Sequence, residues 1–236
     1  MNQTKIFWNN SFLNSWKLFW LTSIPMSLIM TYVMMQNDMT TGSGVSEMIG
    51  FSVRWAVPLI YIVTAASALP ILFPSNFTRW WFRNRKFIGL TFAVAMAWQG
   101  TFIYIMSTFH RDYYFNDVYL LRNEIEGSIG YIFLAAMVLT SFKFGSKFVS
   151  DKQWKMIHKG GVYFLWAYAY TVYWWDLFYY PDPVLFQFIF YWLGFTAFAL
   201  RIFAWGKKRL KQSNVTPSLQ SSVFAVSYTH LRAHET

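Results

Sequence analysis

The chain has 236 residues, of which 56% are hydrophobic and 13% charged, with a net charge of +10 and no cysteine. A soluble domain would carry about a quarter charged residues, so this composition predicts an integral membrane protein. The lack of cysteine excludes disulfides, thiolate nucleophiles, cysteine-ligated zinc and iron–sulfur clusters. We interpret the positive charge as a determinant of membrane topology and expect no nucleic-acid partner.

Six apolar runs follow one another along the chain, and each predicts a helix that crosses the bilayer. Three of them contain no charge over roughly 20 residues or more, which is enough for one crossing. The other three are slightly shorter, but flanking Lys and Arg side chains can reach the interface and extend them. The predicted spans are residues 18–36, 55–74, 87–109, 127–144, 160–175 and 184–205. The first run is long enough to stay in the membrane, and we expect no cleavable signal peptide.

Basic residues concentrate in alternate connections between these runs. Lys and Arg precede the first run, separate the second from the third and the fourth from the fifth, and follow the sixth. The other connections carry mainly Asp and Glu. Because Lys and Arg favour the cytoplasmic side, both termini are predicted to be cytoplasmic. The expected fold is therefore an all-α integral membrane protein, a bundle of six transmembrane helices. Its first partner is the lipid bilayer, and its expected location is the bacterial inner membrane.

The regions outside the bundle have different compositions. Residues 1–17 are predicted to form a cytoplasmic N-terminal segment, and residues 18–206 the transmembrane domain. Residues 207–225 are basic and then polar, which is typical of a disordered tail. Residues 226–236 have no apolar period, and we interpret them as read-through from an adaptor or vector. The histidines within that last stretch are therefore left out of the functional interpretation.

Few polar residues fall within the predicted spans, and none near mid-membrane is charged. Ionisable residues inside a membrane usually mark proton or ion pathways, so pumps and cation-coupled transporters are disfavoured. A small-molecule transporter remains a weaker alternative. Two histidines lie within the predicted bundle. His110, at the outer end of the third span, is interpreted as a loop residue, whereas His158 lies at the inner start of the fifth span.

Three short motifs occur in the central part of the chain. They are the basic stretch RNRKFIGL over residues 83–90, Leu139-Thr140-Ser141 at the end of the fourth span, and W-x-x-x-H-K over residues 154–159 followed by Tyr163. In this order and spacing they resemble the ferric-reductase-like transmembrane domain family, which includes the haem-binding subunit of the periplasmic methionine-sulfoxide reductase system. The resemblance covers residues 83–175. It implies a six-helix domain that holds haem b between histidine pairs and passes electrons across the membrane.

The chain departs from this family at the haem ligands. His158 matches a family histidine and is the retained possible haem ligand. Gln99 falls at the position of the histidine in the third span, and Thr171 or Val172 falls at that of the second histidine in the fifth span. A bis-histidine haem needs one imidazole from each facing helix, and neither an amide nor a hydroxyl replaces it. We therefore expect no ordinary mid-membrane haem b. Gln99 is instead expected to hydrogen-bond to Thr171, Tyr168 or Ser67 on a neighbouring helix.

Two functions follow from the resemblance and from its gaps. The first is a membrane electron-transfer subunit in which His158 is the retained axial ligand. It would need a separate electron donor and a membrane or periplasmic redox partner as acceptor, because no Gly-rich phosphate loop follows a predicted strand. The chain itself is thus expected to hold neither flavin nor nicotinamide, no catalytic residue and no metal site apart from haem. The second function is a non-redox membrane scaffold or accessory subunit that has kept the fold and lost the cofactor.

Overall fold

The computed structural model describes the backbone of residues 11–232 and the side chains of residues 12–212. Over this range the chain is all-α and has no strand. The long helices are α2 (Ser15–Gln36), α3 (Gly42–Ala65), α5 (Asn76–Phe109), α7 (Leu121–Thr140), α9 (Asp151–Phe178) and α10 (Leu185–Arg232). The short ones are η1 (Ser11–Leu13), α4 (Leu69–Leu72), α6 (Arg111–Tyr113), η2 (Tyr114–Val118) and α8 (Lys143–Ser146). The first ten residues of the predicted N-terminal segment and the last four of the predicted read-through lie outside the described residues.

Four helices are long and apolar enough to cross a membrane, namely α2, α3, α5 and the Leu185–Gln212 part of α10. They also expose large apolar side chains such as Leu28, Tyr104 and Phe203, as helices in contact with lipid do. These helices support the prediction of an integral membrane protein. The helices α7 and α9 fall outside this group because charged residues occupy their first turns and aromatic residues of modest hydropathy fill much of α9.

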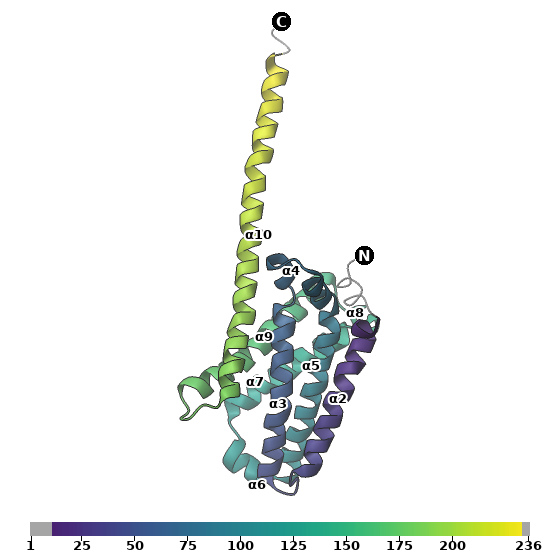
Figure 1. Ribbon diagram of the computed structural model, residues 1–236, viewed down its shortest axis with the longest axis vertical. Helices are drawn as coiled ribbons and strands as arrows, with labels where there is room; N and C mark the ends of the chain where they lie inside the picture. Colours follow the sequence, from purple (N-terminus) through teal and green to yellow (C-terminus); the bar gives the residue numbers. More distant parts are fainter. Residues whose placement is uncertain (1–10, 233–236) are drawn as a thin grey trace.

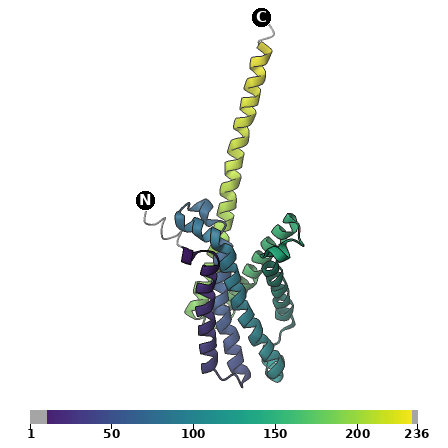
Figure 2. The same ribbon diagram turned by 90° about the vertical axis from the view of Figure 1, so that its right-hand side faces the viewer.

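The long helices form a bundle with two parts (Figures 1 and 2). The helices α2, α3 and α5 lie side by side, and α3 and α5 share the most extensive interface. The helix α7 pairs with α9 on another side of the bundle, and α10 packs against α3 and α9 and then continues far beyond the bundle. The main core lies between α3, α5, α7 and α9 and includes Ile60, Ala95, Leu134 and Leu165.

Polar caps decide where several of these helices begin. The Thr41 side chain accepts a hydrogen bond from the Gly44 amide at 3.2 Å and starts α3. Reciprocal bonds between Ser75 and Thr78 start α5, and those between Ser150 and Gln153 start α9. Each cap satisfies backbone donors that the first turn of a helix leaves without a partner. The Ser150 cap places the following turn of α9, which carries Trp154 and His158, next to the end of α7.

The second apolar helix differs from its predicted limits. The sequence predicted a span over residues 55–74, whereas α3 starts at Gly42 and ends at Ala65, before the separate short helix α4. The Thr41 cap sets the early start, and Pro70 removes a backbone donor where the predicted span would have continued. Arg54 therefore lies near the middle of α3 rather than in front of a span. Its guanidinium carbon is 4.7 Å from the ring centroid of Phe186 on α10.

The last helix also extends past its predicted end. The sequence predicted a disordered tail over residues 207–225, whereas α10 continues as one helix to Arg232. Starting a helix is the costly step, and each further residue then adds one hydrogen bond. Because the apolar part of α10 has already formed the helix, the polar residues that follow can extend it. Lys207 contributes by donating from its Nζ to the Ile71 carbonyl oxygen at 2.8 Å.

Two glycines allow helices to approach closely. A Cβ at Gly161 on α9 would lie 2.7 Å from the Met137 sulfur on α7. A Cβ at Gly194 on α10 would lie 2.7 Å from the Tyr61 ring on α3. Small residues serve this purpose in membrane helix interfaces because association there depends on close packing. The positions of α7, α9 and α10, which surround the site described next, thus depend partly on these two contacts.

Candidate functional site

A cavity of about 890 Å³ lies among α3, α5, α7, α9 and α10, at the end of the bundle where α4 and α8 lie (Figure 1). Its floor is apolar and includes the buried side chains of Ile60, Leu90, Leu134 and Met137. Arginine and lysine side chains also line the cavity. We call the whole cavity the basic cavity, after its lining residues Arg83, Arg85, Lys86, Lys143, Lys155, Lys159 and Arg201. The described residues that line it include no Asp or Glu.

The three motifs of the sequence meet at this cavity, at the end of α7. The Trp154 indole donates from Nε1 to the Thr140 carbonyl oxygen at 3.0 Å. The Lys86 ammonium donates to the Ser141 carbonyl oxygen. These bonds satisfy carbonyl groups that the last turn of a helix leaves without a partner. One residue from each motif therefore takes part in holding α5, α7 and α9 around the cavity.

His158 is held on two sides at the wall of the basic cavity. Its ring stacks on Trp154, with 4.2 Å between the centroids. Its Nε2 atom lies 3.0 Å from the Thr140 hydroxyl. That hydroxyl has a single hydrogen, which it donates to the Ala136 carbonyl oxygen at 2.6 Å. We infer that the Thr140 oxygen accepts from His158, so that Nε2 carries a proton.

The charge around His158 favours its neutral form. Burial lowers the pKa of the His158 imidazole, and the nearby cations Arg85 and Lys86 lower it further. Like charges and loss of hydration both disfavour the protonated ring. A neutral imidazole with its proton on Nε2 agrees with the hydrogen bond to Thr140. His158 thus acts in this geometry as a hydrogen-bond donor that joins α9 to α7.

Gln99 has a partner that the sequence did not predict. The Tyr131 hydroxyl on α7 lies 3.4 Å from the Gln99 Oε1 atom and 3.1 Å from the Met96 carbonyl oxygen. The ring of Tyr131 fits there because Gly100 has no side chain, and a Cβ would be 3.3 Å from the hydroxyl. The predicted bonds from Gln99 to Thr171, Tyr168 or Ser67 are replaced by this contact, since α7 rather than α9 lies next to this part of α5.

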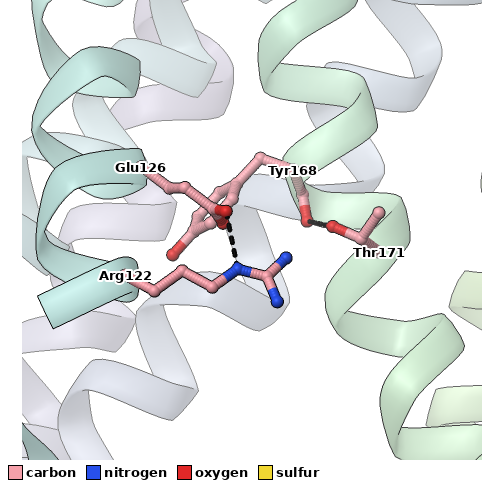
Figure 3. A network of polar contacts seen from close by, with 4 residues as sticks. All are labelled: Arg122, Glu126, Tyr168 and Thr171. Atoms are coloured by element: carbon pink, nitrogen blue, oxygen red, sulfur yellow. Dashed lines mark hydrogen bonds and ion pairs between the residues drawn. The ribbon is translucent and has the colours of Figure 1, made fainter. Parts of the chain in front are cut away.

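Thr171 makes only a local bond. Its hydroxyl donates to the Tyr168 carbonyl oxygen, one turn earlier on α9, at 2.9 Å, and its side chain is exposed. Figure 3 shows the same region, where the Tyr168 ring reaches toward α7. There Arg122 and Glu126 form an ion pair of 2.8 Å. Thr171 is therefore bonded within its own helix.

These positions do not fit a haem that two side chains from facing helices would ligate. Nε2 of His158 is within hydrogen-bond distance of Thr140, Gln99 is bonded to Tyr131, and Thr171 is bonded to its own helix. The chain has four histidines, and two of them lie in the stretch after residue 225. The other, His110, lies at the opposite end of α5, where its Nε2 is 3.2 Å from the Met39 carbonyl oxygen. Within residues 12–212, His110 and His158 thus do not pair their imidazoles on one iron.

Arg201 is the residue of this site that sequence reasoning missed. Its side chain is half-buried on α10, where Nη1 donates to the Thr64 carbonyl oxygen at 3.3 Å. Its guanidinium carbon lies 4.4 Å from the ring centroid of Tyr163. A signal was present, because Arg201 lies inside the predicted sixth span, and an ionisable residue within a span is a functional candidate.

Comparisons of the chain with protein-family models, with curated proteins and with solved structures gave no match.

Proposed function

We propose that this chain is a six-span protein of the bacterial inner membrane, of the ferric-reductase-like kind, that acts as a non-redox scaffold or accessory subunit. The observation that carries this proposal is the state of His158. Its Nε2 atom, the usual donor to haem iron, lies 3.0 Å from the Thr140 hydroxyl, whose hydrogen goes to the Ala136 carbonyl oxygen. Gln99 and Thr171, at the other ligand positions of the family, supply no imidazole.

The six crossings and the cytoplasmic termini belong to the same proposal. Alternation of basic and acidic connections supports them, since Lys and Arg remain on the cytoplasmic side. In this arrangement the basic cavity opens toward the cytoplasm. Because the chain has no cysteine, single cysteines can be introduced without a background. We expect Lys147→Cys to react with a membrane-impermeant maleimide only from the cytoplasm, and Asp117→Cys and Asp182→Cys only from the outside. Labelling of Lys147→Cys from the outside would contradict the topology.

A membrane electron-transfer subunit is the second candidate. The meeting of the three family motifs around His158 favours it, because that is where the family pattern places a retained ligand. In this case His158 would hold haem b as the only imidazole, after giving up its bond to Thr140. The electrons would come from a separate donor and pass to a membrane or periplasmic redox partner.

A visible absorption spectrum separates the two candidates. The full chain would be purified from cells supplied with haem precursors and measured in its oxidised and reduced forms. A scaffold gives no Soret band above that of the His158→Ala variant, which serves as the control. A reduced Soret and α band at one haem per chain, lost in His158→Ala, would contradict the scaffold and support the electron-transfer subunit.

A further inference from the structure

The basic cavity combines concentrated positive charge with an apolar floor. Its cations come from four separate elements: Arg83, Arg85 and Lys86 from α5, Lys143 from α8, Lys155 and Lys159 from α9, and Arg201 from α10. The Arg122–Glu126 ion pair does not line this cavity. Like charges gathered without a carboxylate repel one another, and a bound anion offsets that cost. The first requirement for an occupant is therefore negative charge.

Arg201 is the least exposed of the cations that line the cavity. A guanidinium has five N–H donors, and within the described part of the chain one of them is bonded, to the Thr64 carbonyl oxygen. The stacked ring of Tyr163 and this single bond hold the group in place. An arginine held in this way can present two parallel donors to an oxyanion, and phosphate groups match that geometry.

The rest of the cavity selects for an apolar body attached to that anion. Below the cations lie the buried side chains of Ile60, Leu90, Leu134 and Met137. A free inorganic anion would leave these apolar surfaces exposed to water, whereas the apolar part of an amphiphile would bury them. The volume of about 890 Å³ also lies within the range of small-molecule sites, well above the size of a single phosphate.

The surface beside the cavity favours a lipid over a soluble amphiphile. The lining residues Phe142 and Lys143 lie at the start of α8, and Phe144 within α8 and Phe148 just after it are exposed. The Lys147 ammonium lies 5.2 and 4.9 Å from the centroids of these two rings. Aromatic rings next to lysines are typical of the membrane interface, where anionic phospholipid headgroups lie. An acyl chain could thus leave the cavity along this face into the bilayer.

We propose that the basic cavity binds an anionic phospholipid, with the phosphate at Arg201 and the neighbouring lysines and the glycerol and first methylenes on the apolar floor. The complex joins α5, α9 and α10 through the shared headgroup. This inference goes beyond the scaffold function proposed above and rests on it in one respect, because a haem held by His158 would lie at the wall of the same cavity.

Native mass spectrometry of the full chain in a nonionic detergent tests the inference. The chain would be titrated with phosphatidylglycerol and, separately, with phosphatidylcholine of the same acyl chains. We expect phosphatidylglycerol to bind at least about tenfold more tightly, because each cation near an anionic headgroup adds attraction. Arg201→Gln should weaken phosphatidylglycerol binding by about tenfold. The matched control is Arg209→Gln, an exposed arginine on the same helix that does not line the cavity.

A second pair of variants keeps the test independent of whether Arg201→Gln folds. The double variant Lys143→Gln with Lys159→Gln removes two exposed cations of the cavity, and Lys152→Gln with Lys208→Gln removes two exposed cations outside it. Only the first double variant should lose binding. Equal loss in both would show that surface charge alone attracts the lipid and would overturn the inference. Equal binding of the two lipids to the wild-type chain would overturn it too.

Competition with inorganic phosphate distinguishes a lipid site from a site for a soluble anion. If the apolar floor contributes, millimolar phosphate leaves the phosphatidylglycerol complex intact. Full displacement of the lipid by phosphate at that concentration would assign the cavity to a soluble phosphate compound instead. The absorption spectrum reports haem and the mass spectrum reports lipid, so failure of this inference and failure of the proposed function are read out separately.

Discussion

Gly194 lies on α10 against two tyrosine rings and offers a direct test of how α10 packs. A Cβ at this position would be 2.7 Å from Cζ of Tyr61 on α3 and 3.0 Å from Cδ2 of Tyr170 on α9. Carbon atoms repel strongly at such distances, since their optimal separation is about 3.5–4.0 Å. Tyr61 is only 3% exposed, so its ring cannot move into open space. We therefore expect Gly194→Ala to push α10 away from α3 and α9.

The size of the effect can be worked out by comparison with Gly206 on the same helix. Overpacking costs about 1–3 kcal/mol, whereas the change from Gly to Ala adds about 1 kcal/mol of helix propensity. A Cβ at Gly206 meets nothing within 4 Å, so Gly206→Ala gains the propensity without the repulsion. The difference between the two variants isolates the steric term. It amounts to about 1–3 kcal/mol, or about 5- to 140-fold in the unfolding equilibrium.

The two variants would be compared with the wild-type chain by unfolding the purified protein in mixed detergent micelles with increasing SDS. Near-UV circular dichroism reports the packing of the aromatic side chains around Tyr61 and Tyr170. Gly194→Ala should unfold at a lower SDS fraction than Gly206→Ala. If both variants unfold at the same SDS fraction, α10 does not rest on these rings, and the wall of the basic cavity that carries Arg201 is placed differently.

Three further predictions concern single side chains. The Tyr61 hydroxyl has no hydrogen-bond partner among the described residues, so Tyr61→Phe should leave stability unchanged or raise it by up to about 1–3 kcal/mol, and a loss in the same SDS titration would reveal a partner. Because burial lowers the pKa of His158, the unfolded chain binds more protons, and stability should fall as the pH drops below about 6.5, the ordinary value. His158→Asn should flatten this dependence, and an unchanged pH profile would contradict the placement of His158. Trp154→Phe removes the donor to the Thr140 carbonyl oxygen and should cost about 1 kcal/mol, whereas no change on SDS unfolding would show that this bond does not hold α7 to α9.

The sequence allowed the helical, membrane-embedded character of the chain to be predicted, because uninterrupted apolar runs have few alternatives in lipid. The limits of α2 and the end of α5 agree closely with the predicted spans 18–36 and 87–109. The start of α3 was predicted wrongly. Apolar content marks where lipid can lie, whereas a helix begins where a cap such as Thr41 satisfies its first amides.

The candidate site was predictable only in part. His158 and its neighbours could be selected from the motif spacing, and Arg201 could have been selected as a cation inside a predicted span. The partner of Gln99 could not be predicted, because the order of residues does not say whether α7 or α9 lies beside this part of α5. Contacts such as that of Tyr131 with Met96 and Gln99 depend on which helices are neighbours and on which of their turns lie side by side.

The amino-acid order by itself determined the helices, their apolar character and the uneven distribution of positive charge, since these depend on local hydropathy and backbone hydrogen bonding. Only the tertiary structure decided that cations from α5, α8, α9 and α10 line one cavity with an apolar floor, and that His158 Nε2 lies next to the Thr140 hydroxyl. Both features arise from contacts between residues distant in sequence. Close approaches at Gly161 and Gly194 set these contacts, and no local pattern encodes them.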